Sequence, residues 1–227
     1  ALHHKAGGDR LVPGDRRKSG KEKDGSEHLA GGPQKAGKKS GKASATTQLN
    51  PQIASTQNLK EMMAICESNM QSFDPINITT ALHRLAKMTG GVMTREERQE
   101  FQERVCKQLL QRANDSIRDF GPRTLSNLMW SLATLDIKPG LQLIQAVTMH
   151  TRSRFQIFTP LDFMNMVWAF AKLRITPTAR FAKAILKQSL SLVVRFTCQD
   201  ILTFVSSLST LKLKPGNELI LALSHQA

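Results

Sequence analysis

Two segments of the chain carry an amide and an aromatic ring at matching positions. Asn127 and Trp130 are three residues apart, and Asn165 and Trp168 repeat that spacing 38 residues later. In a helix this spacing places both side chains on one face. An amide can hydrogen-bond the edges of unpaired bases, and an aromatic ring can stack on them. The chemistry suggested is recognition of single-stranded RNA.

The same four residues have a second interpretation, as packing residues. A helix inside a stack lies between two neighbours, which favours Trp130 and Trp168 as contacts between units. Asn127 and Asn165 fit a base contact and a hydrogen bond near a helix end equally well. In a more distant upstream copy of this segment, His83 takes the place of the tryptophan.

Lys and Arg residues occur close to these positions in the sequence and also in the segments that follow. Acids are sparse between residues 121 and 199, where only Asp136 and Asp162 occur. A run of charges is often a solvated surface, but this scarcity of acids favours contact with phosphate. The candidate RNA-binding residues are Lys87, Arg123, Asn127, Arg152, Arg154, Asn165, Lys172, Arg174, Arg180, Lys183 and Lys187.

The elements that would position these residues recur at a period of 38. Self-similarity at such a period predicts stacked supersecondary units. A fourth copy begins at Phe73, at an offset of 47 from Phe120. The interval holds for Phe120, Phe158 and Phe196, for Trp130, Trp168 and Ser206, and for Pro139, Pro177 and Pro215.

Each unit is predicted to be a helical hairpin. An aromatic residue precedes a capping position, a proline usually follows, and an apolar residue stands four positions into the helix, which is the pattern of a hydrophobic staple. The prolines that recur every 38 residues in the connectors are expected to begin the second helices. No stretch alternates with period two for long enough to form a strand. We predict an all-α protein, a right-handed α-solenoid of units 73–119, 120–157, 158–195 and an incomplete 196–227, preceded by a capping helix from about residue 56.

Residues 1–55 have a different composition. They are rich in Gly, Lys and Ser and hold almost no large apolar residue, so we expect a disordered basic tail. Residues 32–39 nearly match a phosphate-binding loop, but Lys39 stands where a Ser or Thr should bind magnesium. We therefore expect no nucleotide site there.

Charge and composition narrow the class of partner. The chain of 227 residues has a net charge of +14, and residues 56–227 alone hold 21 Lys/Arg against 13 Asp/Glu. A basic excess of this kind indicates a polyanion such as nucleic acid. The three cysteines and six histidines show no metal spacing, and no apolar run reaches the roughly 20 residues of a membrane span. We expect no catalysis, no cofactor, no metal, no small-molecule substrate and no membrane partner.

The last helix has an apolar face at the end of the predicted row. Leu219, Ile220 and Leu223 begin it, whereas terminal repeats usually present a polar outer face. We expect this end to be covered, either by more of the protein or by a partner.

Two nine-residue segments carry a resemblance to a known family. Asn127-Leu-Met-Trp130-Ser-Leu-Ala-Thr-Leu135 and Asn165-Met-Val-Trp168-Ala-Phe-Ala-Lys-Leu173 resemble the first helix of octotricopeptide repeats. That family and the similar heptatricopeptide proteins are organellar RNA-binding α-solenoids of algae and apicomplexan-type protists. The first and fourth units depart from the pattern, because His83 and Ser206 replace the tryptophan.

The resemblance implies a non-catalytic RNA-binding protein of an organelle, a mitochondrion or alternatively a plastid. At one base per repeat, four repeats distinguish only about 256 sequences, so specificity must come from elsewhere. More repeats in a longer protein, or permanent incorporation in a large ribonucleoprotein, would supply it, and the second suits a short solenoid with a basic tail. We therefore expect a component or assembly factor of the mitochondrial ribosome that contacts rRNA beside ribosomal or other ribonucleoprotein proteins. The alternatives are a protein–protein scaffold and a factor for mRNA maturation or stability.

Overall fold

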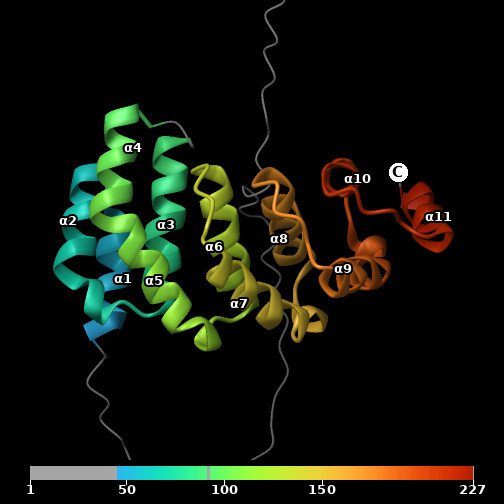
Figure 1. The fold of residues 1–227 in the computed structure, drawn as a ribbon, viewed down its shortest axis with the longest axis horizontal. Helices are drawn as coiled ribbons and strands as arrows, with labels where there is room; N and C mark the ends of the chain where they lie inside the picture. The colour runs from blue at the N-terminus through green and yellow to red at the C-terminus, as the bar shows by residue number, and fades with distance from the viewer. Residues whose placement is uncertain (1–44, 91–92, 227) are drawn as a thin grey trace, which may run out of the picture. The chain divides into compact units, whose positions relative to one another are not determined.

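The computed structural model describes residues 45–90 and 93–226 (Figure 1), and no strand occurs among them. The all-α prediction is thus confirmed for this part of the chain. The helices are α1 (Ala45–Ser55), α2 (Leu59–Asn69), α3 (Pro75–Thr89), α4 (Arg95–Phe101), α5 (Lys107–Asp115), α6 (Pro122–Thr134), α7 (Leu141–Arg152), α8 (Pro160–Lys172), α9 (Ala179–Leu192), α10 (Cys198–Thr210) and α11 (Asn217–Gln226). A π-helical segment, Gln102–Cys106, joins α4 to α5.

The helices pack in two sets. The first helices of the units contact one another in the order α1, α3, α6, α8 and α10. The second helices contact one another in the order α5, α7, α9 and α11. Successive members of each set lie side by side in Figure 1. Residues 38 or 47 positions apart in sequence therefore become neighbours in space.

Each unit begins as the sequence predicts. The caps Asp74, Thr159 and Thr197 accept hydrogen bonds from the third backbone N–H of their helices, and each forms a reciprocal capping box. Gly121 caps α6 without a side-chain acceptor, also as expected. The phenylalanines and the apolar residues of the staple pattern are all buried, namely Phe73, Ile78, Phe120, Leu125, Phe158, Phe163, Phe196 and Ile201.

The connectors between first and second helices share one unusual backbone conformation. Asp136, Arg174 and Lys212 all have positive φ, of 55°, 52° and 56°. In each case the next residue donates its N–H back across the helix end, as Ile175 does to the carbonyl of Phe170 at 2.9 Å. This is a Schellman motif, in which the left-handed position usually holds glycine.

The prolines of these connectors do not begin the second helices, so that prediction is wrong. Pro139 and Pro177 each stand two residues before the first helical residue. The residue after Pro177 is the cap, because Thr178 accepts a hydrogen bond from the N–H of Phe181. A proline side chain has no acceptor, so it cannot perform this function itself.

The boundary expected at residue 55 is also wrong. Residues 45–55 form α1, in which Leu49 and Ile53 are buried and which packs against α3. The guanidinium of Arg84 donates to the carbonyl of Thr56 and ties the end of this segment to α3. A neighbouring helix lets two apolar residues stabilise a segment whose composition alone predicts disorder. The expectations for residues 1–44 lie outside the described residues.

The helix that follows starts as predicted. Asn58 caps α2 by accepting from the N–H of Glu61 at 2.9 Å. Glu61 in turn accepts from the N–H of Gln57 rather than from that of the cap, so the predicted box is shifted by one residue.

The left-handed connectors lead to a first prediction. Changing Arg174 to Gly should stabilise the protein by about 1 kcal/mol, because a side chain at positive φ clashes with its own backbone and glycine has none. Urea unfolding measures the change, with Arg174→Ala as the control that removes the charge but keeps the β-carbon. Equal stabilities for the two variants would contradict this explanation.

Candidate nucleic-acid interface

The two tryptophans that the sequence analysis singles out lie in a continuous aromatic ladder. The ladder is formed by His83 of α3, Trp130 of α6 and Trp168 of α8. The ring centroids of His83 and Trp130 are 5.0 Å apart, and those of Trp130 and Trp168 are 6.5 Å apart. Pairs at these separations contribute about 0.5–1.5 kcal/mol beyond the area they bury. The ladder therefore helps to hold three units together.

Burial decides between the two interpretations of Trp130. Its side chain is 4% exposed, and neighbouring rings lie on two sides of it. A base cannot stack on it without displacing a neighbour, so Trp130 is a packing residue. Trp168 is half-buried, and the exposed Ser206 at the next equivalent position supplies no ring.

The two asparagines differ in a way the sequence does not indicate. Asn127 is half-buried, whereas Asn165 is buried and its Oδ1 has no hydrogen-bond partner. Trp130 Nε1 and Thr134 Oγ1, at neighbouring positions of the ladder face, are buried and unpartnered too. Asn165 is thus not on an open surface where it could contact a base.

The edge of the ladder at His83 is electropositive. Burial lowers the pKa of His83 below its ordinary value of 6.5, and the charges of Lys87 and Arg123 lower it further. Both cations are exposed. His83 itself is therefore neutral at pH 7, and Lys87 and Arg123 are the charges available at this edge.

The charge of the folded part is unevenly distributed. Residues 56–120 hold 9 Lys/Arg and 9 Asp/Glu, whereas residues 121–227 hold 12 Lys/Arg and only 4 Asp/Glu, a net charge of +8. In the part that the structure describes, both ion pairs lie within residues 56–120, where Arg104 contacts Glu67 at 2.8 Å and also Glu100. The cations described between residues 121 and 226 have no acidic partner within ion-pair distance.

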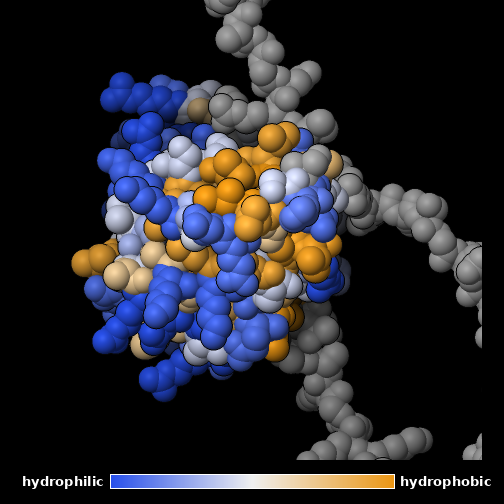
Figure 2. Space-filling model, turned by 90° about the vertical axis from the view of Figure 1, so that its right-hand side faces the viewer, coloured by the Kyte–Doolittle hydropathy of each residue, from blue (hydrophilic) through white to orange (hydrophobic). Residues whose placement is uncertain are grey.

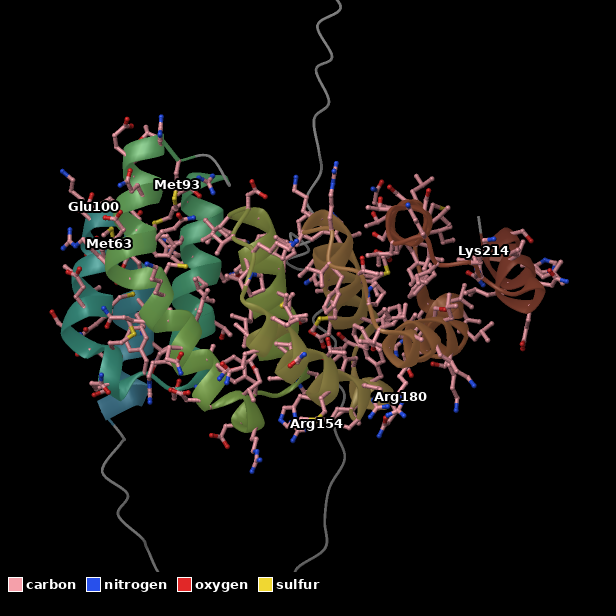
Figure 3. All side chains as sticks on the ribbon, viewed as in Figure 1. Met63, Met93, Glu100, Arg154, Arg180 and Lys214 are labelled. Atoms are coloured by element: carbon pink, nitrogen blue, oxygen red, sulfur yellow. The ribbon has the colours of Figure 1, made fainter. Side chains whose placement is uncertain are left out.

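Most of the predicted cations are exposed, on α7, at the end of α8, on the connector that follows and on α9. These are Arg152, Lys172, Arg174, Arg180, Lys183 and Lys187. The helices α7 and α9 pack against each other. Figure 3 shows Arg154 and Arg180 at the same edge of the molecule. We name the six exposed residues the outer basic surface.

Arg154 differs from its neighbours because it also has a structural contact. Its Nη1 donates to the carbonyl of Phe120 at 2.9 Å. Arg112 makes the equivalent contact in the preceding unit, with Nη2 donating to the carbonyl of Phe73 at 2.8 Å. Both guanidinium groups tie the end of a second helix to the first phenylalanine of its own unit. Sequence reasoning missed this role, because bonds that span more than 30 residues leave no local pattern.

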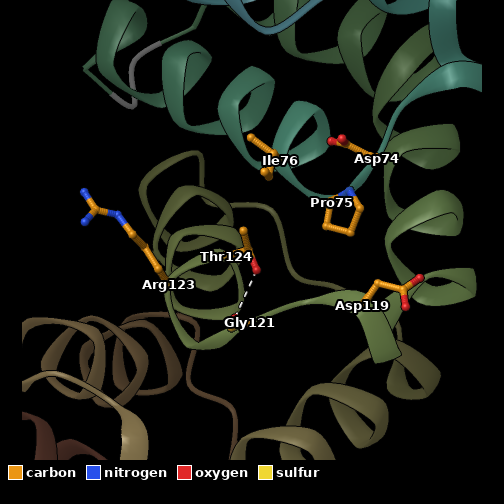
Figure 4. A pocket seen from close by; sticks show the side chains of 7 residues that line it. All are labelled: Asp74, Pro75, Ile76, Asp119, Gly121, Arg123 and Thr124. Carbon is orange, nitrogen blue, oxygen red and sulfur yellow. Dashed lines mark hydrogen bonds between the residues drawn. The ribbon is translucent and has the colours of Figure 1, made fainter. Parts of the chain in front are cut away.

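A shallow cavity of about 290 Å³ lies where α3 and α6 begin, and the sequence did not predict it (Figure 4). Its lining includes the carboxylates of Asp74 and Asp119 and a single guanidinium, that of Arg123, which points away from them in Figure 4. Two acids against one base make a poor site for phosphate. The lining residues are Asp74, Pro75, Ile76, Asp119, Gly121, Arg123 and Thr124.

In the described ranges we looked for a reactive thiol, a metal site and a membrane-spanning helix. Burial raises the pKa of the Cys66 and Cys106 thiols to about 12, which keeps both protonated and poorly nucleophilic. No group of three His, Cys, Asp or Glu side chains comes together there in an arrangement that could hold a metal ion. None of the helices described has the length and apolarity needed to cross a membrane.

A comparison with protein-family models finds none that matches this chain, and a comparison with curated proteins finds no match either. The resemblance to octotricopeptide repeats therefore rests on the two segments that contain Trp130 and Trp168.

Arg152 and Arg154 provide a matched test of structural against surface roles. Arg154→Gln should lower the free energy of unfolding by about 1–3 kcal/mol, because the carbonyl of Phe120 loses a charged donor. Arg152→Gln should change it by less than about 0.5 kcal/mol, since that side chain is exposed. Urea denaturation compares the two, and equal effects would show that the contact with Phe120 contributes nothing.

The lowered pKa of His83 predicts a pH dependence of stability. The unfolded chain binds the proton more tightly, so the stability present above pH 6.5 should decrease as the pH falls through that value. The free energy of unfolding is compared at pH 7.5 and 5.5 for the natural chain and for His83→Phe. The difference should be smaller in the variant, and an unchanged difference would mean that His83 is not its source.

Proposed function

We propose that this protein is a non-catalytic RNA-binding α-solenoid whose outer basic surface contacts the phosphate backbone. The order of helix contacts supports the solenoid, because each unit packs chiefly against the next. The single observation that carries the RNA proposal is the net charge of +8 on residues 121–227, whose described cations have no acidic partners. A polyanion is the partner that such a surface attracts most strongly.

Phosphate contact and base contact are assigned to different residues. The outer basic surface neutralises phosphate, and Lys87 and Arg123 supply a second basic edge beside His83. Trp130 and Asn165 serve packing, because both are buried. Binding of this kind follows the backbone and carries little sequence information.

Weak sequence preference suits a protein held permanently in one ribonucleoprotein. We therefore propose a component or assembly factor of the mitochondrial ribosome, with rRNA and ribosomal proteins as partners and the plastid as the alternative location. The resemblance to octotricopeptide repeats supports the organelle. A scaffold for proteins and a factor for mRNA maturation or stability are the competing functions.

RNA binding should depend on the second and third units. Changing Arg180, Lys183 and Lys187 together to Gln should weaken binding of single-stranded RNA for all sequences. It should also reduce the slope of log K against log salt by about two, since each phosphate contact on a single strand contributes about 0.7. Fluorescence anisotropy across a salt series measures both effects.

The matched control changes three exposed cations of the electroneutral range 56–120, Arg95, Lys107 and Arg118, to Gln. The control should bind RNA almost as the natural chain does. Equal losses in the two triple variants would contradict a localised surface, and no RNA affinity at low salt would favour the scaffold.

The cellular target needs a separate experiment. Crosslinking in organelles, followed by sequencing of the bound RNA, should give reads concentrated at one rRNA locus. Reads spread over messenger RNAs that share one motif would contradict the ribosomal proposal and favour transcript maturation.

A further inference from the structure

The last unit exposes an apolar surface on α10 and α11. Leu202 and Val205 of α10 are 66% and 47% exposed, and Ile220 and Leu221 of α11 are 50% and 60% exposed. Figure 2 looks onto this end of the molecule and shows hydrophobic residues gathered across it. We name these four residues the end face. Large contiguous patches of exposed apolar residues mark interaction sites.

Equivalent positions in the other units show what covers such a surface elsewhere in the protein. The residues of α8 that correspond to Leu202 and Val205 are Met164 and Val167, which are 2% and 0% exposed. The corresponding residues of α6, Ser126 and Met129, are buried as well. Both α6 and α8 have a following first helix packed against them. At Leu202 and Val205 the end face is therefore a surface that the fold elsewhere covers with a helix.

A small residue allows that helix to come close. Ser209 of α10 corresponds to Ala171 of α8 and Ala133 of α6, which are buried. Small side chains at a helix contact shorten the distance between helix axes. A helix seated on α10 would pass near Ser209, as the neighbours of the inner helices pass near the two alanines.

The charged residues near the end face indicate which kind of helix would bind there. Arg195, just before the last unit, and Lys212 and Lys214 within it are exposed, and Figure 3 shows Lys214 beside α11. Two acids lie among residues 193–226, of which Asp200 is held in the capping box of α10 and Glu218 is exposed. Three exposed cations against one exposed acid leave this end basic, so an occupant with acidic edges would be attracted to it.

A second copy of this protein is disfavoured by its charge, because it would bring another excess of +8 from residues 121–227. Like charges across a contact are repulsive. An acid suits this position, since Ser126 of α6, the residue that corresponds to Leu202, donates a hydrogen bond to Asp162 of α8.

We propose that the end face binds an amphipathic helix of a partner protein, with its apolar side on Leu202 and Val205 and acidic residues at its margins. The partner helix lies where a further first helix would continue the set. This site is separate from the outer basic surface and does not depend on RNA binding.

A synthetic probe tests the proposal directly on the full chain. The probe is an amphipathic peptide of about 20 residues, long enough to be helical, with a leucine seam flanked by glutamates. A second peptide has the same seam flanked by lysines. Fluorescence anisotropy should show the acidic peptide binding at least about tenfold more tightly at low salt, with the preference decreasing as salt rises.

Variants locate the binding site. Leu202→Gln with Val205→Gln should weaken the acidic peptide at least about tenfold. The matched control, Leu141→Gln with Met149→Gln, changes two equally exposed apolar residues of α7 and should leave binding unchanged. Circular dichroism melting should be unchanged in both double variants, because all four side chains are exposed.

Three results would overturn the proposal. The first is equal binding of the two peptides or no binding of either, and the second is an α7 control that weakens binding as much as the α10 variant does. The third is a stable dimer in light scattering that the α10 variant dissociates, which would assign the end face to a second copy of the chain.

Discussion

A first helix inside the set must bury two opposite sides at once, and the rest of the structure depends on this constraint. In α8 the buried residues include Phe163, Met164, Val167 and Phe170, whereas α10, which has one neighbouring first helix, leaves Leu202 and Val205 exposed. Apolar burial of this extent stabilises the contact between units. It also fixes the register, because the same positions must meet in every unit.

The constraint on the inner helices determines where charge can be placed. Buried cations without partners are costly, so the excess charge of residues 121–227 lies at exposed positions near helix ends, on α9 and on the connectors. The aromatic ladder follows from the same packing, since equivalent positions on adjacent helices bring Trp130 between His83 and Trp168. The proposed RNA surface and the proposed protein surface are thus separate consequences of one arrangement.

Local patterns predicted the first helices of the units and their starts well, but not the starts of the second helices. The staple residues, the caps Asp74, Thr159 and Thr197 and the period of 38 are all properties of short segments, and the structure contains them. Long-range relations were missed, because no local signal carries them. Examples are the packing of α1 on α3, the bond from Arg154 to Phe120, and the burial of Asn165 on a face that the helical period alone would leave open.

The most direct test of the central claim is to map which peptides of the protein become crosslinked to single-stranded RNA under ultraviolet light, by mass spectrometry. The account predicts adducts in residues 172–187, which carry Lys172, Arg174 and the three cations of α9. Adducts confined to residues 95–112 of the electroneutral range 56–120, or to the ladder residues of α6 and α8, would contradict it.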